Sequence, residues 1–284
     1  EKVLLGSGAS REAARYIKAL TPNGSIAVVC DSNTAIIAEK HLMGALTGAF
    51  LAELPAASLH ADEHAVALLE NLLRRDTALF VAVGAGTIHD ITRYVAHAHK
   101  RPFISIPTAA TVDGFVSTVA AMTWHNLKIT FPAAAPVAVF ADTDIFASAP
   151  QRLTASGAAD MLAKHTALAD WKIANIVTDE YYCTRIANME RDALDAVTAN
   201  IDNIASGEPQ HVEALMYGLL LSGLAMQMVG NSRPASGAEH HISHLWEMGV
   251  IAPPPDALHG EKVGVGLVMT AETYHRIVKY PDEA

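Results

Sequence analysis

The feature that most limits the fold of this 284-residue chain is the alternation of short apolar runs with helical stretches in its first half. Runs rich in β-branched and apolar residues predict buried strands at 25–30, 78–83, 103–106 and 137–141. The intervening segments predict helices over 33–46, 64–75 and 90–98. Such βαβ units form a parallel sheet with helices on both faces. Ligands of these sheets bind beyond the carboxyl ends of the strands, so we expect chemistry just after Val83 and Ile106.

The second half has a different pattern, with apolar residues at every third or fourth position. This spacing predicts helices over 158–176, 179–204, 212–228 and 258–278, and the Pro-rich segment 252–255 is interpreted as a loop. We therefore expect an α/β fold in which a Rossmann-like parallel-sheet domain, 1–147, precedes an all-helical domain, 148–284.

Composition excludes several classes of protein. A formal net charge of −10 without a run of Lys and Arg argues against nucleic acid as a partner. The only cysteines, Cys30 and Cys183, do not form a Cys-x-x-Cys pair, which fits a reducing cytoplasm. The first residues contain too short an apolar run for a signal peptide. The longest apolar stretch, 212–230, carries Glu213 and Gln227, so it is interpreted as a buried helix and no membrane contact is expected.

The turn after the strand at 78–83 has the sequence GAGTIHD, residues 84–90. Glycines let backbone N–H groups approach an anion, and the following helix N-terminus adds favourable partial charge, so a dinucleotide pyrophosphate fits here. The candidate cofactor-binding residues in this turn are Gly84, Gly86, Thr87, Ile88 and Asp90. Asp31 follows the first predicted strand, where it either binds an adenosine ribose or simply starts a turn.

The segment 107–117, PTAATVDGFVS, follows the strand at 103–106. Its hydroxyls are suited to a nicotinamide ribose or a phosphate, and Asp113 is suited to a substrate hydroxyl. An ordinary Thr/Asp turn is the alternative interpretation.

The histidines of the second half form the strongest local cluster. His240 and His244 are four residues apart, hence on one helix face. His259 opens a later predicted helix, and Asp160 lies on an earlier one. One carboxylate and two imidazoles from different helices would hold a divalent cation with open positions for water or substrate. Structural histidines are the alternative.

Four stretches of the sequence occur together in a recognisable order. They are GAGTIHD at 84–90, PTAATVDGFVS at 107–117, SGAADMLAK at 156–164, and SRPASGAEHHISHLWE at 232–247 with LHGEKVGVG at 258–266. In this combination the chain resembles the iron- or zinc-dependent alcohol dehydrogenases, a family that includes glycerol dehydrogenase and, more distantly, dehydroquinate synthase. Within that family it is most similar to the sn-glycerol-1-phosphate dehydrogenases of the bacterial type.

The resemblance implies a dehydroquinate synthase-like fold and an NAD(P)- and metal-dependent oxidoreductase acting on CH–OH groups. The implied cofactors are NAD(P) and one Zn, Ni or Fe ion. The implied reaction is reduction of dihydroxyacetone phosphate to sn-glycerol 1-phosphate, a phospholipid precursor. A small phosphorylated triose or polyol is therefore the expected substrate, and a homo-oligomer such as a dimer the expected assembly. NAD-dependent glycerol dehydrogenase and a cyclising lyase like dehydroquinate synthase are the alternatives.

The resemblance also assigns roles to individual residues. It implies that residues 86–90 bind the pyrophosphate, and that NAD contacts Thr108, Thr111 and Ser117. It implies metal ligation by Asp160, His240 and His259, and substrate contact by Asp113 and His244. A shift of the alignment by one residue would make His241 the ligand in place of His240.

The chain departs from the family pattern at a few points. Ala85 replaces a usual glycine, and Thr111 replaces a common serine but keeps the hydroxyl. Family members continue for further helices, so the helical domain is expected to be incomplete at its C-terminus. Arg233 and Lys262 are candidate partners of a substrate phosphate, or else they are solvated or paired with Glu residues.

Overall fold

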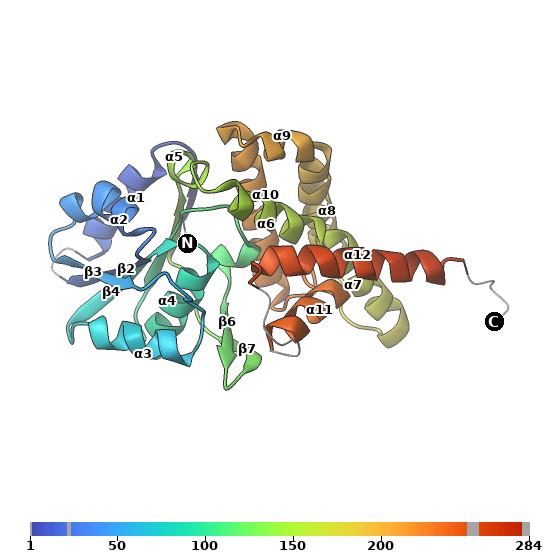
Figure 1. Ribbon diagram of the computed structural model, residues 1–284, viewed down its shortest axis with the longest axis horizontal. Coiled ribbons are helices and arrows are strands. Elements are labelled where there is room, and N and C mark those ends of the chain that lie inside the picture. Colours follow the sequence, from blue (N-terminus) through green and yellow to red (C-terminus); the bar gives the residue numbers. More distant parts are fainter. Residues whose placement is uncertain (1, 22–23, 249–255, 280–284) are drawn as a thin grey trace.

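The computed structural model describes residues 2–21, 24–248 and 256–279. Its centre is a six-stranded sheet in the order β1-β8-β5-β4-β2-β3, and every pair of neighbouring strands is parallel (Figure 1). The strands are β1 (Lys2–Leu5), β2 (Ser25–Asp31), β3 (Ala49–Leu54), β4 (Thr77–Gly84), β5 (Phe103–Pro107) and β8 (Ala138–Ala141). The predicted parallel α/β sheet is thus confirmed.

Helices cover both faces of this sheet. On one face, α1 (Ala9–Leu20) and α2 (Ala35–His41) pack against alternate side chains of the central strands, such as Val28 and Val81. On the other face, α3 (Glu63–Leu72) and α4 (Gly86–Ala98) bury the intervening side chains, such as Phe80. Side chains alternate between the faces of a strand, so fully apolar strands supply both layers.

Two of the six strands have no counterpart in the sequence prediction. β1 pairs with β8 from Lys2↔Ala138 onward, and β3 pairs with β2 from Ile26↔Ala49 onward. Both are edge strands, which carry fewer buried apolar residues and so give a weaker pattern. The predicted helix over 33–46 is also shorter, because it ends at His41 and a 3₁₀ turn, η1 (Met43–Ala45), follows.

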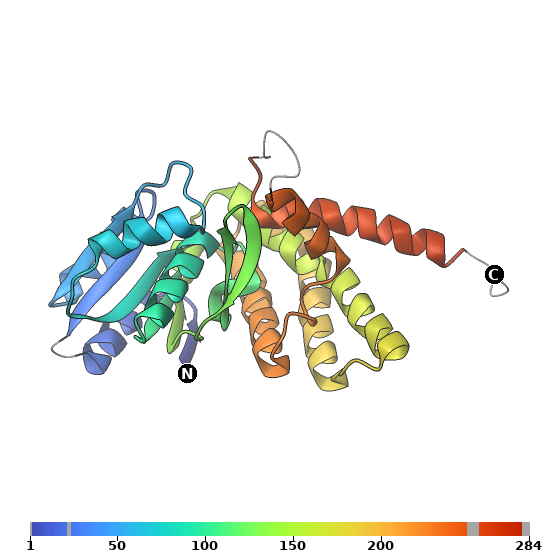
Figure 2. The same cartoon turned by 90° about the horizontal axis from the view of Figure 1, so that it is seen from below.

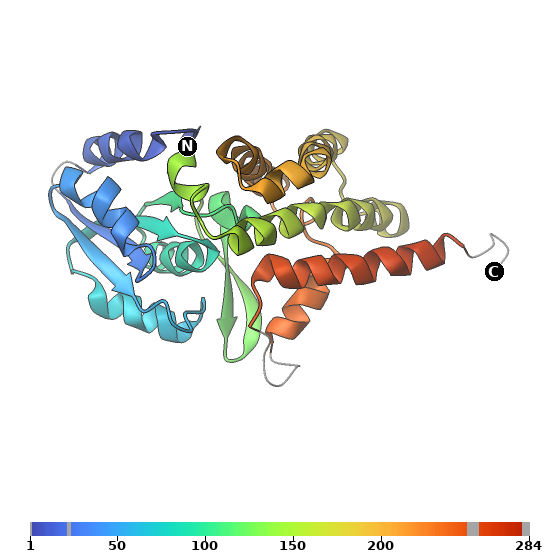
Figure 3. The same ribbon diagram turned by 45° about the horizontal axis from the view of Figure 1, so that its top comes forward.

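The part of the chain after β8 is helical wherever the structure describes it (Figures 1 and 2). Its helices are α5 (Thr143–Phe146), α6 (Gln151–Leu162), α7 (Lys164–Thr178), α8 (Thr184–Ala199), α9 (Ile201–Ser206), α10 (Pro209–Val229), α11 (Ala238–Glu247) and α12 (His259–Ile277). Helix α12 lies along α6 and α11, and its C-terminal end extends away from the rest of the fold (Figure 3).

In the second half of the chain, two predicted helices were wrong in their bounds. The helix expected over 158–176 is divided into α6 and α7 at Ala163. The backbone of Ala163 keeps nearly helical angles, with φ −59° and ψ −21°, so the two helices are separated only by a tightened turn. The helix expected over 179–204 begins only at Thr184, because Asp179 ends α7 in the left-handed region at φ 57°. The predicted Pro-rich loop at 252–255 lies outside the described residues.

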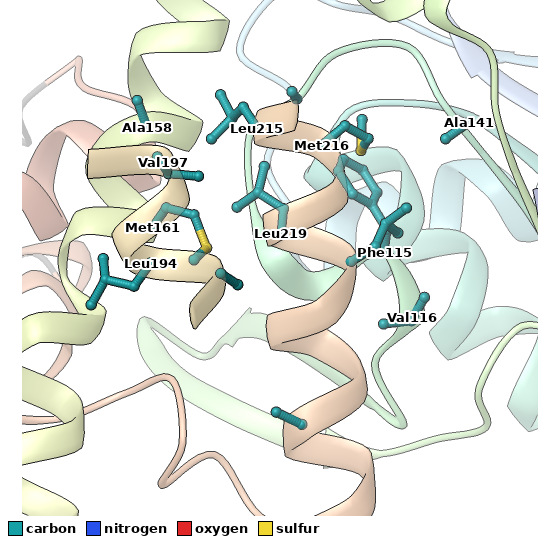
Figure 4. Close-up of a cluster of buried hydrophobic side chains, with 14 of the residues drawn as sticks. Phe115, Val116, Ala141, Ala158, Met161, Leu194, Val197, Leu215, Met216 and Leu219 are labelled. Atoms are coloured by element: carbon teal, nitrogen blue, oxygen red, sulfur yellow. The ribbon is translucent and has the colours of Figure 1, made fainter. Parts of the chain in front are cut away.

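Helix α10 forms the centre of the helical half. Its Leu215, Met216 and Leu219 lie between α8, α6 and the segment that holds Phe115 (Figure 4). Among the described residues it is the one helix long and apolar enough to cross a membrane, and 50% of its most apolar window is buried in the fold. This burial agrees with the predicted core helix.

A hairpin of β6 (Val119–Trp124) and β7 (Leu127–Pro132) lies between the sheet and the helical half (Figures 1 and 2). Trp124 and Phe131 pack against Tyr94 of α4, with ring centroids 5.5 and 5.2 Å from the tyrosine ring. The sequence did not predict this hairpin. Its tip, His125 and Asn126, has positive φ at both residues but lacks the glycine that usually marks such turns.

Candidate active site

The turn from β4 into α4 has the geometry of an anion-binding site. Helix α4 begins at Gly86, and its N-cap residue, Ala85, makes no side-chain cap. The first N–H groups of a helix have no intrahelical acceptor, so those of Gly86, Thr87 and Ile88 point toward the end of the sheet. A Cβ on Gly84 would lie 2.6 Å from that of Ile88, so this strand end needs glycine for close packing.

The remaining predicted nucleotide contacts differ in how free their polar atoms are. Asp31 starts a turn, because its Oδ1 accepts the N–H groups of Asn33 and Thr34, both at 2.9 Å. The Ser117 hydroxyl is within 3.0 Å of both the N–H and the carbonyl oxygen of Val119. By contrast, the buried hydroxyl of Thr111 has no hydrogen-bond partner among the described residues. A ligand that accepts or donates here would satisfy it.

Asp90 is half-buried and forms an ion pair with a fully buried arginine. Its Oδ1 lies 2.7 Å from Nη1 of Arg93, whose guanidinium also donates to the carbonyl oxygens of Gly114 and Val119. Burial raises the pKa of Asp90 against the opposing effects of Arg93 and Lys128. Arg93 thus ties α4 to the segment that carries Asp113. By holding Arg93, Asp90 also helps to fix the arrangement of these loops.

The helical half brings Asp160, His240 and His259 together. They come from α6, α11 and α12, and one potential ligand atom of each lies within 4.8 Å of the others. Asp160 Oδ1 is 3.3 Å from His240 Nε2, and both side chains are almost completely buried. His241, the alternative in the sequence, is exposed and lines a separate pocket of about 340 Å³ together with Arg233.

Two carboxylates orient the imidazoles of this cluster. Glu239 Oε1 lies 2.9 Å from His240 Nδ1, and Glu247 Oε1 lies 3.0 Å from His259 Nδ1. A hydrogen bond at Nδ1 orients the ring and directs Nε2 into the cluster, as in most metal-binding histidines. Burial lowers the pKa of His240, but hydrogen bonds to Asp160 and Glu239 outweigh it and raise that pKa to about 9. The donor set of one carboxylate and two oriented imidazoles fits a divalent transition metal ion.

Lys164 joins the cluster to Asp113. Its ammonium group is completely buried, 2.8 Å from Asp113 Oδ2 and 3.3 Å from Asp160 Oδ1. Burial lowers its pKa, but these two carboxylates outweigh burial and raise it, so the lysine is charged at neutral pH. Ser222 of α10 also donates to Asp113 Oδ2, at 3.0 Å. Asp113 is therefore fixed by two donors.

Glu190 of α8 lies behind Lys164. Its side chain is completely buried, and neither carboxylate oxygen has a hydrogen-bond partner among the described residues. Burial raises its pKa to about 7, although the charge of Lys164 acts in the opposite direction. The helical half thus contains a carboxyl group that is neutral over most of the acidic range.

His244 faces the same space from α11. Its ring centroid lies 6.1 Å from that of His240 and 5.8 Å from that of His259. Burial is the main cause that lowers the pKa of His244 to about 3, so its imidazole is neutral at neutral pH. The structure also groups His244 with Glu247 and His259 as a second set of potential ligands.

Two glycines of α12 let the helices approach closely at this site. A Cβ on Gly260 would lie 1.9 Å from the carbonyl oxygen of Ser156, and one on Gly266 would lie 2.5 Å from that of Glu239. No larger residue fits at these points without moving a backbone. The glycines of LHGEKVGVG are therefore explained by helix packing.

The two predicted phosphate partners have different surroundings. Lys262 lies at the site, with Nζ 3.2 Å from Glu247 Oε1. Arg233 makes a bidentate pair with Glu180 through two contacts of 2.7 Å. Of the Glu pairings that the sequence left open, Lys262 pairs with Glu247 of the histidine motif. Arg233 pairs with Glu180, which lies outside that motif.

Sequence reasoning missed several residues of the site, above all Lys128, Lys164, Glu190 and the roles of Glu239 and Glu247. Lys164 had a usable signal, because its i, i+4 spacing from Asp160 puts both on one face of the helical segment. Glu239 and Glu247 flank the histidines in the same motif. Lys128 and Glu190 lie outside every motif, and only the fold brings them to the site.

The fold and this cluster together define a class of protein. The family model for iron-containing alcohol dehydrogenases matches residues 4–150, and the chain belongs to this family. The chain is 40% identical over 257 residues to the glycerol-1-phosphate dehydrogenase (NAD(P)+) of Halalkalibacterium halodurans, an alignment covering 88% of this chain and 64% of the relative. It is 38% identical over 285 residues to that of Bacillus velezensis, covering 98% of this chain and 72% of the relative. The family resemblance drawn from the motifs is confirmed.

Solved structures support the same architecture. A probable glycerol dehydrogenase from Sinorhizobium meliloti 1021 matches 99% of this chain and 82% of its own length, with a TM-score of 0.77 at 20% sequence identity. At this identity the likeness concerns the fold alone. The chain spans less than two thirds of the H. halodurans relative, 64% of its length.

Proposed function

We propose that this chain is the nucleotide-, metal- and substrate-binding part of a cytoplasmic, homo-oligomeric enzyme. The reaction is NAD(P)H-dependent reduction of dihydroxyacetone phosphate to sn-glycerol 1-phosphate. The main observation in support is that Asp160, His240 and His259, from three helices, have ligand atoms within 4.8 Å of one another. The names of the relatives supply the substrate.

In this proposal, residues 1–147 bind NAD(P) and residues 148–284 bind the metal ion and most of the substrate. The pyrophosphate accepts hydrogen bonds from the N–H groups that open α4, where no side-chain cap competes. The unpartnered hydroxyl of Thr111 supports a polar ligand next to this loop. Asp31, Asp90, Thr108 and Ser117 stay candidate contacts for the cofactor.

The proposed metal ligands are Asp160, His240 and His259, with Zn, Ni or Fe as the ion. When bound, such an ion acts as a Lewis acid that polarises the ketone of the substrate. Glu239 and Glu247 keep the two imidazoles in the orientation that ligation needs.

The protein's own groups position the substrate and move the proton. Asp113, fixed by Lys164 and Ser222, accepts a hydrogen bond from a substrate hydroxyl. His244, neutral at neutral pH, donates the proton of one ring nitrogen to the new alkoxide while its other ring nitrogen takes a proton from solvent water. Hydride comes from the nicotinamide.

The test compares NADH oxidation by the metal-loaded enzyme with dihydroxyacetone phosphate and with dihydroxyacetone. Two charge-assisted contacts to the phosphate correspond to a preference of about a hundredfold or more. We expect that preference and sn-glycerol 1-phosphate as the product. Equal rates with dihydroxyacetone would favour a glycerol dehydrogenase. Formation of sn-glycerol 3-phosphate, or a cyclised product without net NADH consumption, would also contradict the proposal.

A further inference from the structure

We propose that Lys128, near the start of β7 in the β6–β7 hairpin, forms with Lys262 the subsite that binds the phosphate group of the substrate and so sets its specificity. The inference rests on the proposed reaction and names residues of the same site. Lys128 belongs to none of the sequence motifs that mark the family.

Lys128 extends from the sheet half into the helical half. Its Nζ lies 3.0 Å from Glu247 Oε2 of α11, and its side chain is only 16% exposed. Lys262 of α12 reaches the other oxygen of the same carboxylate, at 3.2 Å, and is 14% exposed. Two ammonium groups from opposite halves of the fold therefore meet at one carboxylate.

The position of this pair matches the place where substrate must bind. Glu247 also holds His259, a proposed metal ligand, at 3.0 Å. The hairpin that carries Lys128 contacts α4, the proposed nucleotide helix, through β6, and it contacts α11 of the metal side through β7. Lys128 thus lies between the two regions that hydride transfer must join.

The hairpin gives Lys128 a fixed position. In the β6–β7 register, Thr123 lies opposite Lys128 and Trp124 opposite Leu127. Residues opposite each other share a face, so the aromatic face with Trp124 covers α4 and the other face turns Lys128 toward α11. The N–H of Thr123 donates to the carbonyl of Ala61 at 2.7 Å, which attaches the hairpin to the sheet half.

The local charge favours an anion. Asp90 is paired with Arg93, and Asp113 with Lys164. Lys128 and Lys262, however, share the single carboxylate of Glu247. At Glu247, two ammonium groups therefore face one carboxylate, although the formal net charge of the chain is −10. A phosphate dianion is the ligand chemistry that such a pair of ammonium groups recognises.

The test uses the metal-loaded enzyme, its Lys128→Met variant, and Lys18→Met as a control. Lys18 is an exposed residue of α1, so its replacement removes the same charge far from the site. We expect kcat/KM for dihydroxyacetone phosphate to fall at least about tenfold in Lys128→Met, in line with one lost charge-assisted contact. The kcat/KM for dihydroxyacetone, which has no phosphate group, should fall much less, so the preference for the phosphorylated ketone should fall. Lys18→Met should behave as the parent enzyme.

Inorganic phosphate gives a second measurement that does not depend on turnover. We expect phosphate to raise the melting temperature of the parent enzyme. The Lys128→Met variant should need a several-fold higher phosphate concentration for the same rise. An equal fall in kcat/KM with both ketones would mean that Lys128 only holds Glu247 in place, and it would overturn the proposal. An unchanged kcat/KM with both ketones would overturn it as well. If the parent enzyme does not reduce dihydroxyacetone phosphate but phosphate binding still requires Lys128, the proposed reaction fails and the anion subsite stands.

Discussion

The proposed nucleotide loop, residues 84–90, and the proposed metal pocket, formed by Asp160, His240 and His259, would obtain their chemistry in different ways. The loop uses backbone N–H groups of consecutive residues at the start of α4. The pocket uses side chains from three helices, and carboxylates and an ammonium group surround them. A backbone site is sensitive to added bulk, whereas a side-chain site is sensitive to lost groups. The two regions should therefore fail under opposite kinds of substitution.

The largest effect should come from removing a group from the metal pocket. We expect Asp160→Ala, His240→Ala and His259→Ala each to weaken metal binding by more than about 100-fold, because even outer partners of a metal ligand contribute 10–100-fold. Turnover should be abolished. Metal content after dialysis, with the metal-induced shift in melting temperature, measures this.

The control for that prediction is His241→Ala. His241 is exposed and points into another pocket, so its loss should leave metal content unchanged. Loss of metal from His241→Ala with retention in His240→Ala would mean that the ligand assignment is wrong by one residue.

The nucleotide loop should fail when bulk is added. Gly86→Val should weaken NADH binding about a hundredfold, the value of two lost charge-assisted hydrogen bonds, because the side chain occupies the space of the pyrophosphate. Fluorescence titration with NADH measures the change. A Cβ at Gly86 would also lie 3.0 Å from Val112 Cγ2, so some loss of stability is expected.

A double variant separates these two effects. Adding Val112→Ala to Gly86→Val should restore most of the melting temperature, since the crowded methyl group is gone, but not NADH affinity. Recovery of affinity together with stability would remove the evidence for a pyrophosphate at this turn.

A smaller effect should follow when only the orientation of a ligand is lost. Glu239→Gln and Glu247→Gln replace the carboxylates that hold His240 and His259. We expect 10–100-fold weaker metal binding from each, measured by competition with a chelator. Glu208→Gln, at an exposed residue, is the matched control. Unaltered affinity in both site variants would show that these carboxylates do not support the ligands.

The smallest effect concerns Glu190 and depends on pH. Burial raises its folded-state pKa from 4.5 to about 7, so the stability that it contributes is complete below pH 4.5 and is lost as pH rises toward 7. Glutamine does not ionise. Relative to the parent, metal-free Glu190→Gln should therefore gain about 1.5 kcal/mol of unfolding free energy between pH 5 and pH 6.5. Urea denaturation at both pH values measures the change, and a pH-independent difference would contradict the assigned pKa.

The two regions also differ in how far the sequence predicts them. The central strands could be predicted because burial on both faces gives unbroken apolar runs, as in Val81 and Phe80 of β4. The proposed nucleotide loop could be picked out in the sequence because its seven residues are contiguous. The edge strands and the β6–β7 hairpin are partly exposed, and their patterns do not distinguish them from loops.

The proposed metal pocket could be predicted only in part from the sequence. Its histidines could be noticed as a cluster, but spacing alone did not distinguish ligands from structural residues. The choice of Asp160, His240 and His259 as ligands came from the family resemblance. Lys128 and Glu190 depend on long-range packing of β7 and α8, which no local pattern in the sequence indicates.

The most direct test of the account is the position of the metal ion in crystals of the enzyme loaded with Zn or Ni and NAD, located by its anomalous scattering. We expect one peak about 2.0–2.2 Å from a carboxylate oxygen of Asp160 and from Nε2 of His240 and His259. NAD should lie with its pyrophosphate at the start of α4. The structure offers a rival set of ligands, His244, Glu247 and His259. A peak held by that set, without Asp160 and His240, would contradict the account.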